Sequence, residues 1–147
     1  MENFNRAKFT ALVAENIDNQ ATREAIFDLL EFAQKNAFKV VGGQNHKSFH
    51  YVVSTRGGSA KLFYCYSYGY VEVALGNFRH LSSTTVSRFV RKLGALSPAF
   101  KYILRFEDKR EKGGTQGFLI KETLVDPIIM KAFKAAVLEL QSKIDLA

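Results

Sequence analysis

The hydrophobic positions of the chain recur with a helical period in its first forty residues. Apolar side chains repeat every three or four residues from Phe9 to Ile17, and a second stripe of the same period runs from Ala21 to Asn36. Both stretches are therefore predicted to be helices. The acids of the second helix fall on the side opposite its apolar stripe, where a solvated surface is expected. They are Glu24, Asp28 and Glu31.

After Ala37 the apolar residues alternate or run together in short stretches, which predicts β-strands. Glycine-containing turns separate these stretches, and Tyr68-Gly69 has the length of a two-residue hairpin loop, in which glycine supplies the positive φ. The pattern therefore predicts an antiparallel meander with one buried and one solvated face. The four expected strands cover residues 38–41, 49–54, 61–67 and 70–75.

A third helix is expected to start at Ser82 or Ser83, because a serine hydroxyl can accept a hydrogen bond from a free backbone N–H of the first turn. Its apolar stripe continues to Leu96. Residues 99–106 fit either a strand or a helix, and the alternation toward Phe106 favours a strand.

The rest of the chain predicts a hairpin followed by a helix. A charged loop over residues 107–114 and a returning strand over 118–123 would complete a C-terminal hairpin. Asp126-Pro127 then starts the last helix, with a carboxylate cap and a proline where no N–H is needed.

These elements predict an α+β fold, with an antiparallel β-sheet (meander plus C-terminal hairpin) and helices packed on one face. A chain of 147 residues suits one domain, residues 1–147, with a core of its own. Thirteen Phe and no Trp make that core phenylalanine-rich. The single cysteine, Cys65, allows no intrachain disulfide and fits a reducing cytoplasm. We see neither a signal-peptide pattern nor an apolar run of about 18 residues that would span a membrane.

Positive charge is concentrated in the middle of the chain. Between Phe38 and Arg105, ten basic residues and a single acid, Glu72, give a net charge of +9, whereas the whole chain carries +7. Such an asymmetry predicts an anionic partner, with nucleic acid first, and a membrane or an acidic protein next. The ten bases are Lys39, Lys47, Arg56, Lys61, Arg79, Arg88, Arg91, Lys92, Lys101 and Arg105.

Three segments taken together resemble a known domain: Phe32-Ala33-Gln34-Lys35-Asn36 ending a helix, Lys47-Ser48-Phe49 followed by Leu62-Phe63 and residues 67–73, and Leu124-Val125-Asp126-Pro127 before an apolar helix. The pattern is similar to a small uncharacterised bacterial α+β domain, sometimes found near restriction–modification genes, over roughly residues 25–145. That family implies the fold and no function. The order of elements also resembles the double-wing DNA-binding domain of the phage transcription factor MotA, a topological likeness.

The expected third helix carries a compact group of cations. Arg88, Arg91 and Lys92 are spaced i, i+3, i+4 and so project together, opposite the apolar stripe. Such a helix could follow phosphates, and arginine could also reach a guanine edge. An ordinary solvated helix face is the alternative.

Tyrosines form the second signal. Five of the six lie between residues 51 and 70. If the Phe63 face is the core, Tyr64 and Tyr66 face solvent near Lys47 and Lys61, where they could stack unpaired bases. If helices cover both faces, they are core residues, since tyrosine is also a good strand former. The glycine turn at residues 56–59, which carries Arg56, could enter a groove, as could the loop at 107–114.

Catalysis and metal binding have little support. Glu107-Asp108-Lys109 has the acid-x-Lys spacing of many metal-dependent nucleases, but it falls in a charged turn. His46, His50 and His80 lack the cysteine or carboxylate cluster that would complete a zinc site. We therefore expect no catalytic residues, no metal and no cofactor, and Cys65 is interpreted as a small buried hydrophobe.

The favoured hypothesis is a non-catalytic nucleic-acid-binding module, with DNA ahead of RNA, that works through the basic helix and the hairpin loops. A protein-interaction module for an acidic partner is the main alternative, and a metal-dependent nuclease using Glu107 and Lys109 is the third. Neither a membrane partner nor a particular oligomeric state is predicted. The expected nucleic-acid-binding residues are Lys47, Arg56, Lys61, Tyr64, Tyr66, Arg79, Arg88, Arg91 and Lys92.

Overall fold

The structure is a computed structural model of the chain and describes residues 2–78, 80–100 and 116–146. Several predictions concern residues outside these ranges. They are the site residue Arg79, most of the expected strand over 99–106, the charged loop over 107–114, and the nuclease-like pair Glu107 and Lys109.

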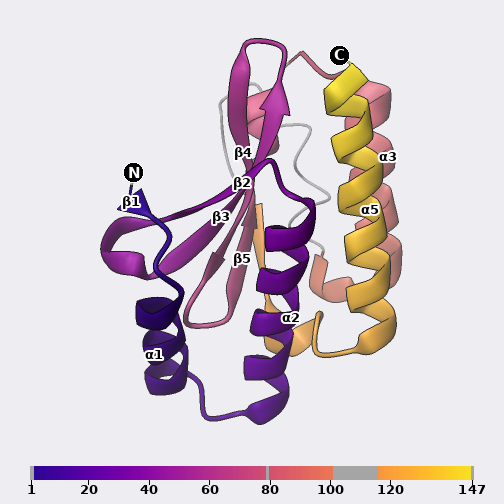
Figure 1. Cartoon of the computed structure of the whole chain (residues 1–147). Coiled ribbons are helices and arrows are strands. Elements are labelled where there is room, and N and C mark those ends of the chain that lie inside the picture. Colours follow the sequence, from indigo (N-terminus) through magenta and orange to yellow (C-terminus); the bar gives the residue numbers. More distant parts are fainter. Residues whose placement is uncertain (1, 79, 101–115, 147) are drawn as a thin grey trace.

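Six antiparallel strands form one sheet, and each strand pairs with its neighbours in chain order (Figure 1). The meander predicted from the alternating pattern is therefore confirmed. A register irregularity at Tyr51/Val52 leaves Leu62 as the extra residue of a bulge. The strands are β1 (Glu2–Asn3), β2 (Lys39–Gly42), β3 (Ser48–Thr55), β4 (Gly58–Tyr66), β5 (Tyr70–Val73) and β6 (Gln116–Leu119).

Four long helices accompany the sheet in the described chain. Side-chain caps start three of them: Asn5, Asn19 and Ser82 each accept a bond from a backbone N–H of the first turn, and of these Ser82 was expected. Asp126 does the same for the last helix, where its carboxylate accepts from the Ile128 N–H at 2.8 Å. The helices are α1 (Arg6–Asn16), α2 (Gln20–Asn36), α3 (Ser83–Leu96) and α5 (Pro127–Leu146).

The helices lie on one side of the sheet, and α3 runs along α5 (Figure 1). Phenylalanine rings join the two layers: Phe133 of α5 is 5.8 Å from Phe63 of β4 and 5.6 Å from Phe118 of β6, measured between ring centroids. All three rings are buried. The predicted α+β architecture, with helices packed on one face and a phenylalanine-rich core, is confirmed.

The C-terminal hairpin is predicted less well. Pro98–Phe100 is a short 3-10 turn and not the start of a strand. The returning strand is shorter than expected, because β6 ends at Leu119 and a 3-10 turn follows over Ile120–Glu122. The Thr123 hydroxyl stabilises this turn by donating to the Leu119 carbonyl at 2.8 Å. Within the described chain, β6 pairs with β5 and so extends the meander.

The hairpin between β4 and β5 also differs from its prediction. Tyr66 pairs with Tyr70, so the loop has three residues and not two. Gly69 adopts φ +89° and its N–H donates to the Tyr66 carbonyl at 3.0 Å. This is the geometry of a three-residue loop that ends in a left-handed residue.

None of the helices in the described ranges is long and apolar enough to cross a membrane.

Candidate functional site

The two faces of the sheet differ sharply in chemistry. Phe63 and Cys65 point into the helix layer and are fully buried, whereas Tyr64 and Tyr66 alternate with them and are half-buried on the opposite face. The pairing of the strands places further polar residues on this second face: His50 and Glu72 flank Tyr64, and Ser48 and Tyr70 flank Tyr66. Tyr64 and Tyr66 therefore lie on the side away from the core, which is the first of the two alternatives that the alternation left open.

Three tyrosine rings stack at the end of this face. The centroids of Tyr66 and Tyr68 are 5.2 Å apart with ring planes 22° apart, and those of Tyr68 and Tyr70 are 6.4 Å apart at 16°. Tyr68, at the tip of the loop, is 54% exposed. We call this surface, made of Tyr64, Tyr66, Tyr68 and Tyr70, the tyrosine face.

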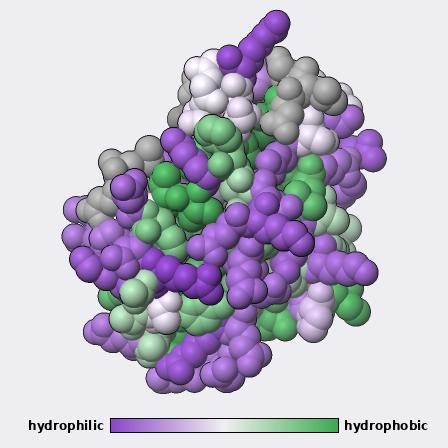
Figure 2. Space-filling model, viewed as in Figure 1, coloured by the Kyte–Doolittle hydropathy of each residue, from purple (hydrophilic) through white to green (hydrophobic). Residues whose placement is uncertain are grey.

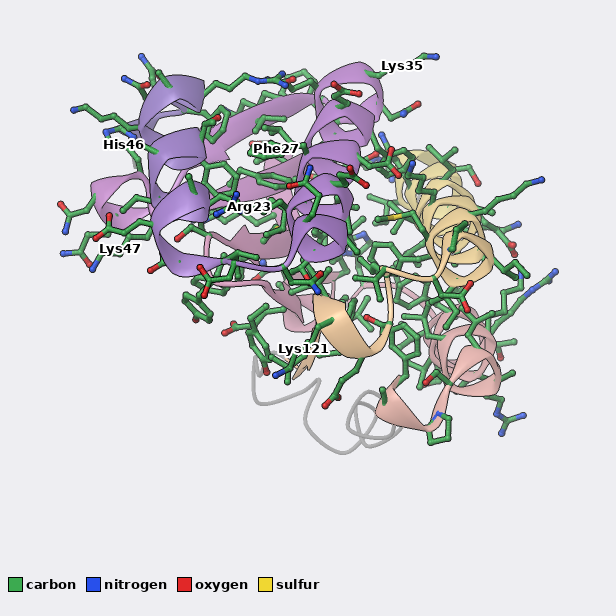
Figure 3. The ribbon with its side chains drawn as sticks, turned by 90° about the horizontal axis from the view of Figure 1, so that it is seen from below. Arg23, Phe27, Lys35, His46, Lys47 and Lys121 are labelled. Atoms are coloured by element: carbon green, nitrogen blue, oxygen red, sulfur yellow. The ribbon has the colours of Figure 1, made fainter. Side chains whose placement is uncertain are left out.

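The backbone holds the tip of the tyrosine face from both sides. The Ser67 N–H donates to the Lys47 carbonyl at 2.8 Å, and the Ile120 N–H donates to the Gly69 carbonyl at 2.9 Å. These bonds continue the β3–β4 and β5–β6 ladders into the loop. They bring two exposed lysines, Lys47 and Lys121, to the same end of the sheet (Figure 3).

Gly117 makes room for Tyr70. A Cβ atom on Gly117 would lie 2.3 Å from Cζ and Oη of the Tyr70 ring, which is far inside contact distance. Only glycine therefore lets the Tyr70 ring lie across β6 in this orientation. The side chain of Tyr70 is placed by a neighbouring strand as well as by its own.

The other end of the tyrosine face carries a cation and an imidazole. Lys61 Nζ lies 5.6 Å from the centroid of the Tyr64 ring, within cation–π range. The His50 ring is 4.6 Å from the Tyr64 ring, and its Nε2 lies 3.0 Å from Ser48 Oγ. Burial, and then the charge of Lys61, lower the pKa of His50 to about 4. The imidazole is therefore neutral at pH 7.

One carboxylate lies among the tyrosines. Burial is the main cause that raises the pKa of Tyr66 to about 12, and the charge of Glu72 adds to it. The pKa values of Tyr68 and Tyr70 also rise, through burial first and Glu72 second. The hydroxyl groups are consequently protonated at neutral pH. The face thus presents neutral rings around Glu72, with lysines near its two ends.

The basic helix is placed as predicted but is partly neutralised. Its apolar stripe is buried, and Arg88, Arg91 and Lys92 are exposed on the other side. Glu139 of α5 pairs with two of them, at 3.1 Å from Arg88 Nε and through a hydrogen bond from Lys92. That hydrogen bond is the main reason why the pKa of Glu139 is lowered. Within the described chain, Arg91 is left as the cation of the three with no acidic partner.

The structure therefore divides the predicted site. Tyr64 and Tyr66 belong to the tyrosine face, Lys61 lies beside Tyr64, and Lys47 lies next to the loop that ends the face. Arg56 lies in the β3–β4 turn at the opposite end of β4 (Figure 1). The three α3 cations belong to the helix layer, where α3 packs on α5.

Sequence reasoning missed several residues that shape this surface. Tyr68 and Tyr70 were counted among the tyrosines but were not assigned to the site, although their spacing of two residues was a usable signal. The positions of Lys121 and Gly117 near the tyrosines depend on the pairing of β5 with β6, and no local sequence pattern predicted that pairing. The pairing of Glu139 with α3 is a contact between distant helices.

Neither metal ligation nor thiol chemistry is indicated in the described ranges. They contain no group of three His, Cys, Asp or Glu side chains that could hold a metal ion. Cys65 is buried in the core, and this burial raises the pKa of its thiol. Comparison with known proteins adds no assignment: no family model, no curated protein and no solved structure matches this chain.

Proposed function

We propose that this protein is a non-catalytic nucleic-acid-binding module that holds unpaired bases on the tyrosine face of its sheet. The stack of Tyr66, Tyr68 and Tyr70 is the observation that carries the proposal. Such rings offer flat apolar surfaces to bases of any sequence, at about 1–3 kcal/mol per stacked base.

The distribution of charge on the face supports the same ligand. Lys47 and Lys121 flank the tip of the stack, and Lys61 lies at its other end beside Tyr64. Cations at the edges suit phosphates, while the neutral rings in the middle suit the flat faces of bases. An acidic protein would use the lysines but would gain little from the rings.

This proposal shifts the expected contact from the basic helix to the sheet. Since Glu139 already pairs with Arg88 and Lys92, a phosphate would have to displace a carboxylate there. Exposed, unpaired bases are available in a single strand but not inside a duplex, so a single strand is the preferred ligand. DNA remains the first nucleic acid to test.

Tyrosine fluorescence provides a direct test, because the chain contains six tyrosines and no tryptophan. Titration with a single-stranded DNA oligonucleotide should quench the emission as bases stack on the rings. Tyr68→Ala should weaken binding about 5- to 150-fold, the range that corresponds to 1–3 kcal/mol, and Tyr68→Phe should keep most of the affinity because the ring remains.

Phe38→Ala is the matched control, since Phe38 is 59% exposed but lies outside the tyrosine face. Equal affinity of wild type and Tyr66→Ala/Tyr68→Ala would contradict the proposal. If, in addition, polyglutamate competes as well as the oligonucleotide does, the surface binds acidic polypeptides by charge, and the protein-interaction alternative replaces the proposal.

A further inference from the structure

The helix side of the molecule contains a groove that plays no part in the proposed function. It lies between α2 and α5 and has a volume of about 840 Å³. The two helices run in the same direction (Figure 1). They are joined at mid-length by an ion pair between Lys134 and Asp28 at 2.7 Å, and near their ends by a bond from the Gln141 side chain to the Asn36 carbonyl at 3.1 Å.

The walls of the groove carry opposite net charges. The α2 wall contributes three carboxylates and, near its C-terminal end, Lys35, and the α5 wall contributes Lys131 and Lys134. Asp28 and Glu31 have partners within the chain, Lys134 and Arg6 respectively. Glu24 accepts only a hydrogen bond from Gln20, and Lys131 forms no ion pair with any described residue. Glu24 and Lys131, on facing walls, thus form no ion pair with a described residue, and neither does Lys35 at the far end of the α2 wall.

One exposed hydrophobic side chain, Leu138, lines the same groove, and two more lie next in sequence to its two ends. Four large ones stand out in the described chain, and one of them, Tyr68, belongs to the tyrosine face. The other three are Leu138, which lines the groove, Ile128, next to the groove residue Pro127, and Phe38, two residues beyond Asn36. Figure 2 shows this side of the molecule, with hydrophobic patches between charged side chains.

From these observations we infer that the α2–α5 groove is the interface of a homodimer, with a second copy of this chain as its occupant. A two-fold axis parallel to the two helices exchanges the walls, so that α2 of each copy meets α5 of the other. Acidic and basic walls then face each other twice, as an isologous interface requires. An axis across the helices would instead bring acid against acid.

The contacts along the helices identify the pair to test. Asp28 lies level with Lys134, and Asn36 with Gln141, so Glu24 lies level with Lys131. In the dimer, Glu24 of one copy faces Lys131 of the partner subunit, and the reverse. At 1.5 Å per residue and about 10 Å per helix diameter, the surface measures roughly 25 by 20 Å. This is at the lower end for specific interfaces, a size that is typical of weak or transient association.

Charge reversal tests the symmetry of the interface by sedimentation velocity, over about 5–500 µM chain, the range that suits a small interface. Wild type should form dimers as the concentration rises. Glu24→Lys and Lys131→Glu should each be monomeric, because each brings like charges together at both pairs. An equimolar mixture of the two variants should form a heterodimer, and the double variant E24K/K131E should recover the homodimer.

Controls with the same change in charge lie on α1, where Glu15 and Lys8 are exposed. Glu15→Lys and Lys8→Glu should dimerise like the wild type. A wild type that stays monomeric throughout, or single variants that fail to associate when mixed, would overturn the proposal. The test is independent of nucleic-acid binding, because the groove and the tyrosine face use different residues on different elements.

Discussion

At the scale of single residues, the environment of a side chain decides its chemistry. His50 lies on the polar face of the sheet, yet it is only 8% exposed and packs against Tyr64. The desolvated site favours the neutral imidazole, and Lys61 opposes a second positive charge beside it. Histidine often serves as a metal ligand or as an acid–base group. His50 is instead a neutral packing residue at pH 7.

This neutral histidine makes stability depend on pH in a predictable direction. The unfolded chain binds a proton at His50 below about pH 6.5, but the folded chain does so only below about pH 4. Between these values the unfolded state holds more protons, so stability falls as the pH falls. We expect His50 to remove about 2 kcal/mol from the free energy of unfolding between pH 7 and pH 5.

Urea denaturation of wild type and His50→Gln at the two pH values measures this contribution. The variant keeps a polar side chain beside Ser48 but does not titrate. Its stability should therefore fall by about 2 kcal/mol less than that of wild type. An equal loss of stability in the two proteins would show that the His50 imidazole can take up a proton in the folded state.

At the scale of elements, the molecule has two candidate binding surfaces for an anionic ligand: the basic helix α3 and the tyrosine face of the sheet. The apolar stripe orients α3 and leaves its cations on the outside, as its periodicity requires. Packing against α5 then brings Glu139 to two of them. Exposed ion pairs of this kind contribute little to stability, but they reduce the positive charge that the helix offers.

Two variants that each remove three positive charges distinguish these elements. Lys47, Lys61 and Lys121 flank the tyrosine face, and Arg88, Arg91 and Lys92 lie on α3. We expect replacement of the first group by Ala to weaken binding to single-stranded DNA about tenfold or more. Replacement of the α3 group should have a clearly smaller effect, with surface changes in stability within about 0.5 kcal/mol per residue.

Fluorescence anisotropy of a labelled oligonucleotide at a fixed salt concentration gives both affinities. A larger loss of affinity in the variant of the α3 group would show that the basic helix is the main binding site. Equal losses would mean that attraction is diffuse and follows net charge alone.

At the scale of the whole molecule, charge and shape determine how salt affects binding. The chain carries a net charge of +7, and in the part of the chain that the structure describes, Lys47, Lys61 and Lys121 lie at the two ends of the tyrosine face. Each neutralised phosphate of a single strand contributes about −0.7 to the slope of log affinity against log salt concentration. Three contacts therefore predict a slope of about −2 for single-stranded DNA.

A salt titration with single-stranded and duplex DNA checks this value. A slope near zero would exclude phosphate contacts. A slope of about −6, near the value for the complete positive stretch, would show that the ligand also covers Arg56 and the cations of α3.

Much of the fold was predictable because its causes are local. The period of apolar residues, the serine cap at Ser82 and Asp126-Pro127 correctly located the four long helices, and alternation correctly located β3 and β4. The expected strand beginning at Ala99 failed at its start, where Pro98–Phe100 forms a 3-10 turn. Alternation over a few residues cannot exclude such a turn.

The local sequence of this chain was sufficient for its helices, its meander and the clustering of charge and tyrosine, since each of these depends on neighbours within a few positions. The tertiary structure alone decided which of those residues meet. Lys121 reaches the tyrosine loop because β6 pairs with β5, and Tyr70 finds space because Gly117 lies beside it. Glu139 reaches α3 because two helices distant in sequence pack together. Contacts of this kind depend on how the elements pack in space, and no short-range pattern in the chain encodes that packing.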